Sequence, residues 1–466
     1  MPEEGLPQPS KPTDDDHDRQ GPPLRARAIR RAEGVEGPRA LQRVLYRSAK
    51  QDPSRRYHAL YSHVHRMDVL WEAWAAVDRN HGAPGVDGLT IDAIKDSGVG
   101  PFLDKLSAAL RAKTYRPAPL RRVYIPKAGK PGKENLRPLS IPTVADRVVM
   151  AAAKIVIEPI FEADFLPVSY GFRPKRSAHM ANEAIRVAAN GGGEWVFDAD
   201  LANCFGSISH EALLGELARR ISDRDMLRLL RAWLRAGIME NGVVTDADTG
   251  TPQGSPVSPL LANVALHVLD RAWQEAGEGL GVLVRYADDL VVLCVSRARA
   301  VEAQRRVEAI LAPLGLVINP SKTRIVHLAR GQDGFDFLGF HHHKVESRRW
   351  RGRHYLQRWP SPRAMNSIRA KVREATQRRY VGLSIKAVVE RLNQILRGWA
   401  AYFRHGNSGD KFRAVDSYVH ERLAIFASNK HGLSGRNWGS RFTPAWYRQL
   451  GVYQLGPSQR LGTVHA

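Results

Sequence analysis

The sequence predicts an α+β fold built around an antiparallel sheet, and three observations lead to this prediction. Short apolar strands are expected between residues 194 and 345, and two of them flank a short acidic turn, which indicates a hairpin. Apolar residues at helical spacing come before and after this block. Strand–helix–strand repeats are few, which disfavours a parallel sheet. With 466 residues, two or three domains are expected.

The net charge of the chain indicates what kind of partner it binds. Lys and Arg number 70 against 47 Asp and Glu, which leaves a net charge of +23. A chain this basic needs a polyanion, and nucleic acid is the leading candidate. The basic residues are not grouped beside an apolar anchor, and the longest apolar run, around 148–157, is too short for a membrane span, so no membrane partner is expected. The two cysteines, Cys204 and Cys294, cannot form a disulfide framework or a zinc finger, which favours the cytoplasm.

The N-terminal half divides at changes of composition. Residues 1–40 are rich in proline and charge and are expected to be a disordered arm. Helical spacing predicts a helical extension over 41–116. The Pro- and Lys-rich segment 117–142 predicts short strands joined by a basic loop, and 144–190 predicts helices interrupted by YGFRPKRSAH.

The later elements follow in order. A strand is expected at 194–201, a helix at 260–275, the hairpin at 281–295, a helix at 297–312 and a further strand pair within 325–345. Past Lys344 the pattern predicts basic helices instead of strands, near 364–379 and 384–403. A separate helical domain is therefore expected at 341–430, followed by a basic, aromatic tail at 431–466.

The candidate metal site is predicted from two groups of aspartates. Alternation along the strand 194–201 puts Asp198 and Asp200 on one face, which alone is explained as well by a solvated edge strand. Asp288 and Asp289 lie at the turn of a hairpin too apolar to be exposed, where two acids are costly unless they bind a cation. If these strands are neighbours, three carboxylates converge as the ligand set for two Mg²⁺ ions, with Mn²⁺ as the alternative.

The motifs and their order resemble the group II intron reverse transcriptase/maturase family over roughly residues 60 to 455. The motifs are GAPGVDG (82–88), LRPLSIPTVADRVV (136–149), YGFRPKRSAH (170–179), WVFDADLANCFGSISH (195–210), GTPQGSPVSPLLAN (250–263), RYADD (285–289), GLVINPSKT (315–323), FDFLGF (335–340) and LNQILRGWAAYF (392–403). The resemblance implies an RNA-directed DNA polymerase of right-hand shape, with fingers and palm at 117–340 and a helical thumb/maturase domain at 341–430.

The resemblance also implies roles for single residues. Asp200, Asp288 and Asp289 would be the catalytic metal ligands. Phe205 would lie beneath the incoming sugar, unless it is an ordinary core phenylalanine. Gln253 and Gly254 would lie against the nucleotide, unless their loop only caps a helix. Lys322 would position substrate phosphates, unless it is a solvated surface charge. Arg137 and Arg147 would contact the triphosphate or the template.

Nucleic-acid contacts are expected in the C-terminal third. The helix near 364–379 presents five basic residues as candidates: Arg369, Lys371, Arg373, Arg378 and Arg379. The tail is a candidate DNA-binding region through Trp438, Trp446 and Tyr447, or these aromatics pack it against the thumb. The run His341 to His343 is expected to be solvated rather than metal-binding, because neighbours on a strand point to opposite faces.

The implied partners are intron RNA and an RNA template, a DNA primer or target, and deoxynucleoside triphosphates. The segment Cys204–Ser209 departs from the family, which usually has a second Asp after the Phe, and this puts catalytic efficiency in doubt. The tail holds no Cys/His elements like those of members with an endonuclease domain, so the bacterial type without that domain is expected. Two other functions stay open: a splicing cofactor whose polymerase has lapsed, and a reverse transcriptase recruited to phage defence.

Overall fold

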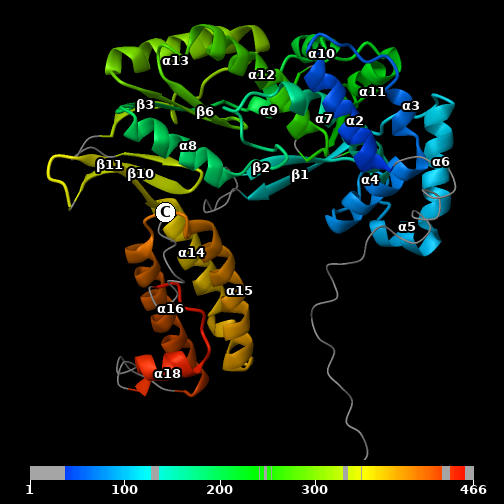
Figure 1. Cartoon of the computed structure of the whole chain (residues 1–466). Helices are drawn as coiled ribbons and strands as arrows, with labels where there is room; N and C mark the ends of the chain where they lie inside the picture. Colours follow the sequence, from blue (N-terminus) through cyan, green and yellow to red (C-terminus); the bar gives the residue numbers. More distant parts are fainter. Residues whose placement is uncertain are drawn as a thin grey trace, which may run out of the picture.

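The computed structural model describes residues 37–126, 136–240, 242–245, 249–252, 254–328, 334–347, 349–432 and 441–456. Nearly all of the expected N-terminal arm lies outside these ranges, as does the basic loop at 127–135. Figure 1 shows a body of helices and sheets from which a bundle of C-terminal helices extends. The mixed helix and sheet architecture predicted from the sequence is therefore confirmed.

Helices make up the N-terminal part of the body, as the helical spacing predicted. They are α2 (Pro38–Gln51), α3 (Tyr61–Val64), α4 (Met67–Arg79), α5 (Ile91–Ser97) and α6 (Val99–Arg111). Helices α2, α3 and α4 pack on the long α7 (Val144–Asp164), which is buried along most of its length. The hydroxyl of Thr143 caps α7 by accepting from the backbone N–H of Asp146 at 3.0 Å.

One four-stranded sheet lies beside these helices. Its order is β2 (Leu136–Ile141), β1 (Leu120–Pro126), β4 (Ile238–Glu240) and β5 (Val243–Thr245). The pair β1–β2 is antiparallel, as expected for 117–142, but β1 and β4 are parallel. A parallel pair needs a long crossover, and here the intervening chain includes α10 (His210–Ala218) and α11 (Arg224–Leu234).

The central sheet carries the predicted hairpin. Its order is β6 (Val282–Tyr286), β7 (Asp289–Cys294), β3 (Trp195–Asp200) and β8 (Arg324–His327), and every neighbouring pair is antiparallel. Phe197 and Ala199 join the main core, on the face covered by α13 (Arg297–Leu311) and, beside it, α12 (Ser258–Ala276). Val196 joins a second core under α8 (Ala178–Asn190). The two faces of β3 are thus separated as alternation predicted.

A third sheet corrects two expectations. Its order is β11 (His354–Pro360), β10 (Phe340–Glu346) and β9 (Phe335–Phe337). β8 does not pair with these strands but joins β3, so the expected strand pair is split between two sheets. β11 is a strand where basic helices were predicted past Lys344. Tertiary contacts explain why this segment is a strand. β11 pairs with β10 along its length, and Leu356 of β11 is buried in the core under α8.

The histidine run is not uniformly solvated, so that expectation was wrong for His342. This side chain is 0% exposed, its Nε2 lies 2.8 Å from the Asn182 amide oxygen, and its ring stacks on Phe335. Burial, with smaller effects of nearby charges, lowers the pKa of His342 to about 3. His341 and His343 are half-buried on the opposite face of β10, as alternation predicted.

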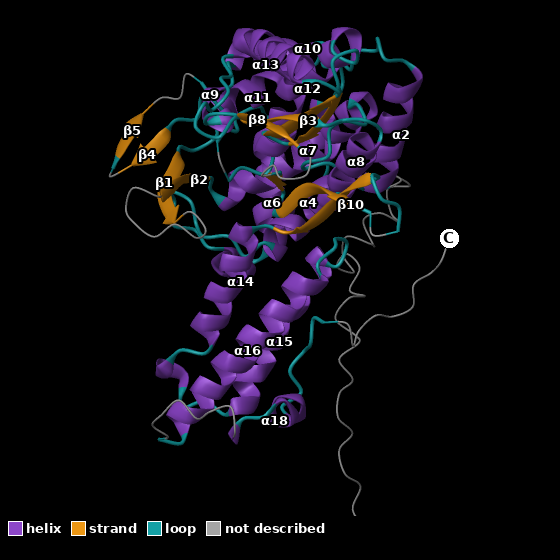
Figure 2. Cartoon of the chain, turned by 90° about the vertical axis from the view of Figure 1, so that its left-hand side faces the viewer, coloured by secondary structure: helices purple, strands orange, loops and turns teal. Residues whose placement is uncertain are grey.

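The C-terminal helices form the bundle that extends downward in Figure 2. They are α14 (Pro362–Ala375), α15 (Ile385–Phe403), α16 (Gly409–Lys430) and α18 (Pro444–Gln449). The predicted apolar stripe of α15 is confirmed, because Val388, Leu392 and Leu396 lie in the core of this bundle. α14 ends earlier than expected, and a 3-10 turn, η3 (Arg378–Tyr380), follows it. In the described ranges, no helix is long and apolar enough to cross a membrane.

Candidate active site

Strand register brings two of the predicted carboxylates face to face. Asp200, the last residue of β3, is the direct partner of Asp289, the first residue of β7, and Asp288 precedes it in the turn after β6. Directly opposed residues of an antiparallel pair point to the same side of the sheet. All three residues are half-buried. The hairpin and β3 are therefore neighbours. The predicted convergence of the three carboxylates depended on this arrangement.

The acids disfavour one another's charged form. Burial first, then the charges of Asp288 and Asp200, raise the pKa of Asp289 to about 7. Burial and Asp200 also raise the pKa of Asp288, while Arg137 and Lys322 oppose the rise. A bound cation would reverse both shifts by favouring the ionised carboxylates. The chemistry of these side chains therefore fits a divalent metal.

The carboxylates do not, as they stand, form a closed metal cluster. Among the described residues, no group of three or more His, Cys, Asp or Glu side chains is arranged to hold a metal ion. The Asp200 carboxylate is engaged by Lys322, whose Nζ lies 2.6 Å from Oδ2. Lys322 is therefore not simply a solvated charge. It neutralises one of the predicted ligands directly.

Asp198 is distinguished from Asp200 by its partner. Its carboxylate pairs with Arg324 of β8 at 3.2 Å, and across the sheet it faces Val291 rather than an acid. Burial raises the pKa of Asp198 to about 6, even though Arg324 opposes the rise. Of the two acids on this face of β3, Asp200 is thus the one beside the hairpin acids.

A pocket of about 590 Å³ opens beside Asp288. Its lining includes four more residues predicted from the sequence, namely Phe205, Gly254, Arg137 and Arg147. Arg137 is exposed, whereas Arg147 is buried and donates to the carbonyl of Ala83 at 2.7 Å in the Gly-rich loop. Gly254 has φ +109°, and a Cβ there would lie 2.9 Å from the Ser140 carbonyl oxygen. Gln253 lies outside the described residues.

Phe172 also lines this pocket and was not predicted from the sequence. Phe172 follows Tyr170 and Gly171 in the motif YGFRPKRSAH, and no role was assigned to it. Its side chain is 51% exposed, its φ is +57°, and its ring meets Phe205 edge-on with centroids 6.4 Å apart. A bulky residue at positive φ is an outlier that the surrounding structure must hold in place. The only sequence signal for it was the motif itself.

The segment that departs from the family is nevertheless well anchored. Helix α9 (Cys204–Ser207) lies against residues 249–251, and the backbone N–H of Thr251 donates to the carbonyl of Phe205 at 2.5 Å. Gly250, with φ +86°, approaches Gly206 so closely that a Cβ would lie 2.7 Å from its Cα. The hydroxyl of Ser209 accepts from Ala212 N–H and caps α10. Serine thus serves as the helix cap here.

Comparisons with known proteins agree with this geometry. The family description "Reverse transcriptase (RNA-dependent DNA polymerase)" matches residues 125–342, and "Group II intron, maturase-specific domain" matches residues 365–443. The group II intron-encoded protein LtrA of Lactococcus lactis is 38% identical over 46% of this chain and 34% of its own length. The chain belongs to the group II intron reverse transcriptase/maturase family.

Other relatives define the extent of this similarity. Protein YkfC of Escherichia coli K12 is 35% identical over 64% of this chain and 86% of its own length. The chain therefore spans most of YkfC but about a third of LtrA. A chain of a solved partial Cas6-RT-Cas1–Cas2 complex matches at 25% identity over 54% of this chain and 42% of that chain, with a TM-score of 0.35.

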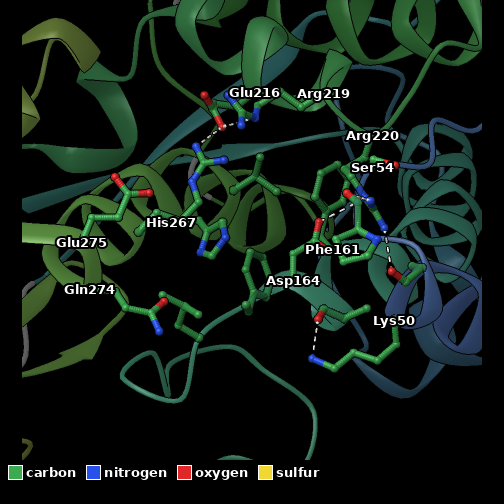
Figure 3. A pocket seen from close by; sticks show the side chains of 17 residues that line it. Lys50, Ser54, Phe161, Asp164, Glu216, Arg219, Arg220, His267, Gln274 and Glu275 are labelled. Atoms are coloured by element: carbon green, nitrogen blue, oxygen red, sulfur yellow. Dashed lines mark hydrogen bonds and ion pairs between the residues drawn. The ribbon is translucent and has the colours of Figure 1, made fainter.

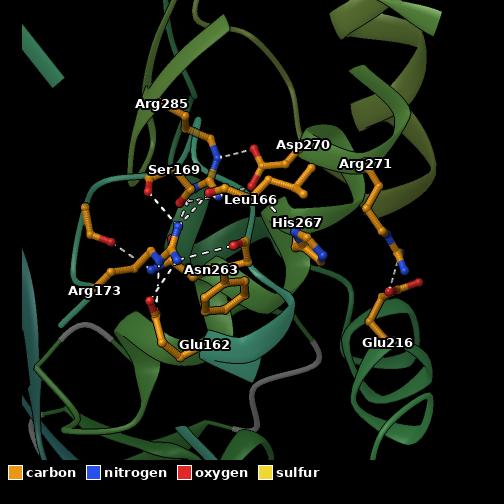
Figure 4. A network of polar contacts seen from close by, with 12 residues as sticks. Glu162, Leu166, Ser169, Arg173, Glu216, Asn263, His267, Asp270, Arg271 and Arg285 are labelled. Atoms are coloured by element: carbon orange, nitrogen blue, oxygen red, sulfur yellow. Dashed lines mark hydrogen bonds and ion pairs between the residues drawn. The ribbon is translucent and has the colours of Figure 1, made fainter. Parts of the chain in front are cut away.

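Within the reverse transcriptase domain, a buried polar network holds the RYADD turn (Figure 4). Arg285 is 0% exposed and donates to both Asp270 oxygens, to Asn263, to Ser169 and to the carbonyl of Ala287. Asn263 in turn donates to the carbonyl of Gly171 at 2.8 Å. One guanidinium therefore joins the turn that carries Asp288 to the segment that carries Phe172.

A second pocket of the domain, about 660 Å³, holds none of the predicted site residues (Figure 3). It lies among α2, α7, α10 and α12. Several of its charged groups have partners: Arg271 pairs with Glu216 at 2.6 Å, Arg220 pairs with Asp164 at 3.2 Å, and Lys50 donates to a backbone carbonyl. The pocket beside Asp288 remains the candidate site.

The maturase region carries the five predicted basic side chains on its surface. Arg369, Lys371 and Arg373 are exposed on α14, and Arg378 and Arg379 on η3. In the tail, Tyr447 is buried in the core of the helical bundle and Trp446 packs against it. For these two aromatics, packing against the helices is thus the better explanation. Trp438 lies outside the described residues.

Proposed function

We propose that this chain is an RNA-directed DNA polymerase that extends a primer 3′-end with deoxynucleotides and also assists the splicing and mobility of an intron RNA. One observation carries the proposal. Asp200 and Asp289 oppose each other in adjacent strands, next to a pocket that Asp288, Arg137 and Phe205 line. Acidic groups beside a nucleotide-sized pocket with a basic wall suit phosphoryl transfer.

In this proposal Asp200, Asp288 and Asp289 hold two Mg²⁺ ions. Bound Mg²⁺ would favour the ionised 3′-hydroxyl and balance the charge on the transferring phosphate. The 3′-oxygen forms a bond to the α-phosphorus, the bond to pyrophosphate breaks, and the hydroxyl proton passes to solvent water. Arg137, exposed on β2, attracts the triphosphate, whereas Arg147 braces the Gly-rich loop through Ala83. Phe205 limits the space beneath the sugar.

The domain assignment follows the same logic. The central sheet with the carboxylates would be the palm, and the sheet of β1 and β2 with the N-terminal helices would form the fingers. Helices α14, α15 and α16 would form the thumb, with their exposed arginines directed to RNA. The basic side chains imply affinity that falls steeply with salt, because phosphate contacts release counterions. Matches to intron-encoded proteins favour this function over a lapsed polymerase or a phage-defence enzyme.

The test is primer extension on an RNA template with Mg²⁺, comparing the wild type with Asp288→Ala and Asp289→Ala. We expect extension by the wild type and a loss of at least about 10³-fold in the variants, because each removes a metal ligand. Splicing of the intron RNA in the same variants separates RNA binding from polymerisation. If the wild type extends nothing, or the variants extend as well as it does, the polymerase proposal fails.

A further inference from the structure

The hairpin of β10 and β11 ends in a strongly basic tip that none of the roles described above uses. The tip, residues 347–353, reads SRRWRGR and contains four arginines, one tryptophan and no acid. In Figure 1 the hairpin projects from the side of the body opposite α5 and α6. It is therefore well separated from the fingers side of the candidate active site.

The described residues of the tip are joined by backbone hydrogen bonds. The N–H of Ser347 donates to the Arg353 carbonyl at 2.7 Å, and the N–H of Arg353 donates to the Trp350 carbonyl at 3.2 Å. The hydroxyl of Ser347 accepts from two further backbone N–H groups, and Glu346 accepts from Gly352, whose φ is +79°. Since these backbone groups are satisfied internally, the side chains are left free to face outward.

Two arginines of the tip lie over the ring of an exposed tryptophan. Trp350 is 54% exposed, and the guanidinium carbons of Arg349 and Arg353 lie 5.0 and 5.9 Å from its ring centroid. Arg351 is exposed beside them. Among the described residues, no carboxylate is within ion-pair distance of these three arginines. Their charge is thus available to an outside partner.

We propose that the tip, through Trp350, Arg349 and Arg353, binds single-stranded nucleic acid outside the primer–template site. An exposed indole offers a stacking face to an unpaired base, and flanking guanidiniums reach the adjacent phosphates. A duplex keeps its bases stacked and offers none to the indole. A membrane is disfavoured because the tip has a single apolar side chain to insert. The inference does not depend on polymerase activity.

The experiment is photocrosslinking of the full-length protein to an unstructured 12-nucleotide strand that carries 5-bromouracil, with RNA and DNA strands of one sequence as separate arms. We expect a crosslink in peptide 347–355, at Trp350, that unlabelled single strand competes away and duplex does not. The yield as a function of protein concentration reports binding at this position alone. The arm with the tighter crosslink identifies RNA or DNA as the ligand.

The matched variants test the charge. Arg349→Ala/Arg353→Ala should weaken the crosslinked complex by roughly 10-fold and lower the slope of log affinity against log salt by about 1.4, for two lost phosphate contacts. Arg43→Ala/Arg47→Ala is the control, because these residues flank the exposed Tyr46 on α2 in a similar pattern, and it should change neither value. No crosslink at the tip, equal competition by duplex, or equal effects of both double variants would overturn the proposal.

Discussion

Arg285 and Asp270 form an ion pair that is completely shielded from solvent, with Nε of Arg285 2.8 Å from Oδ1 of Asp270. Burial raises the pKa of Asp270, but the charge and hydrogen bonds of Arg285 outweigh it, so the net shift is downward. The same guanidinium holds the carbonyl of Ala287, which has φ +56° in the turn before Asp288. The pair is thus coupled to the position of the candidate metal ligands.

Breaking this pair should affect stability and activity differently. Arg285→Met leaves the buried Asp270 carboxylate without its guanidinium partner, so we expect a loss of about 3–5 kcal/mol in the free energy of unfolding. Arg285→Met/Asp270→Leu should recover most of that stability, since an apolar pair can replace a buried ion pair. Primer extension should stay low in the double variant, because Ala287 and Ser169 still lack their donor. Wild-type extension by the double variant would refute this coupling.

Lys322 should compete with metal for Asp200. The Lys322 ammonium forms an ion pair with the Asp200 carboxylate, so removing it should favour binding of a divalent cation there. We expect Lys322→Ala to bind Mn²⁺ about 1.5- to 5-fold more tightly in the absence of nucleotide, the range of an exposed ion pair. Electron paramagnetic resonance of free Mn²⁺ measures this. Lys322→Arg, which keeps the charge, is the control, and unchanged or weaker binding in Lys322→Ala would contradict the prediction.

Phe205 should set the choice of sugar. The ring lies in the pocket beside Asp288 and is held by the contact of α9 with residues 249–251. Phe205→Val opens space where a 2′-hydroxyl would sit, so we expect ribonucleotide incorporation relative to deoxynucleotide to rise about 10- to 100-fold. The ratio of kcat/KM for the two nucleotides on one template measures this. A ratio that does not move would mean that another side chain excludes the hydroxyl.

The buried histidine predicts how stability depends on pH. The pKa of His342 is about 3 in the folded chain against 6.5 for a free side chain, so between these values the unfolded chain binds more protons. Stability should therefore be full above pH 6.5 and fall below it, by up to about 2 kcal/mol at pH 5. Urea unfolding of the wild type and His342→Gln at pH 7 and pH 5 checks this. The exposed His58→Gln is the control, and equal pH dependence of all three proteins would contradict it.

The elements that could be predicted are those whose pattern lies within a short stretch of sequence. Apolar runs and alternation predicted the hairpin with Asp288 and Asp289, and both faces of β3, because burial on a pleated sheet imposes a period of two. The apolar stripe of α15 was predicted in the same way, from its helical spacing. The structure adds the cap, because the hydroxyl of Ser384 accepts from the backbone N–H of Ala387.

Features that depend on distant partners could not be predicted. β11 is a strand because β10 pairs with it, His342 is buried because α8 supplies Asn182, and Lys322 reaches Asp200 across 122 positions of sequence. Nothing in the neighbouring residues encodes these contacts. The role of Arg285 was hidden for the same reason, since its partners come from three separate segments.

The central claim is that Asp200 joins the two hairpin acids in catalysis, and Asp198 provides the matched comparison. Both acids lie on one face of β3. Asp200 lies directly opposite Asp289 in the neighbouring strand, whereas Asp198 forms an ion pair with Arg324. The decisive measurement is the single-turnover rate of primer extension on RNA for Asp200→Asn and Asp198→Asn at saturating Mg²⁺. We expect Asp200→Asn to lose at least about 10³-fold and Asp198→Asn to stay within about tenfold of the wild type. The reverse order, or equal rates, would contradict the proposed metal site.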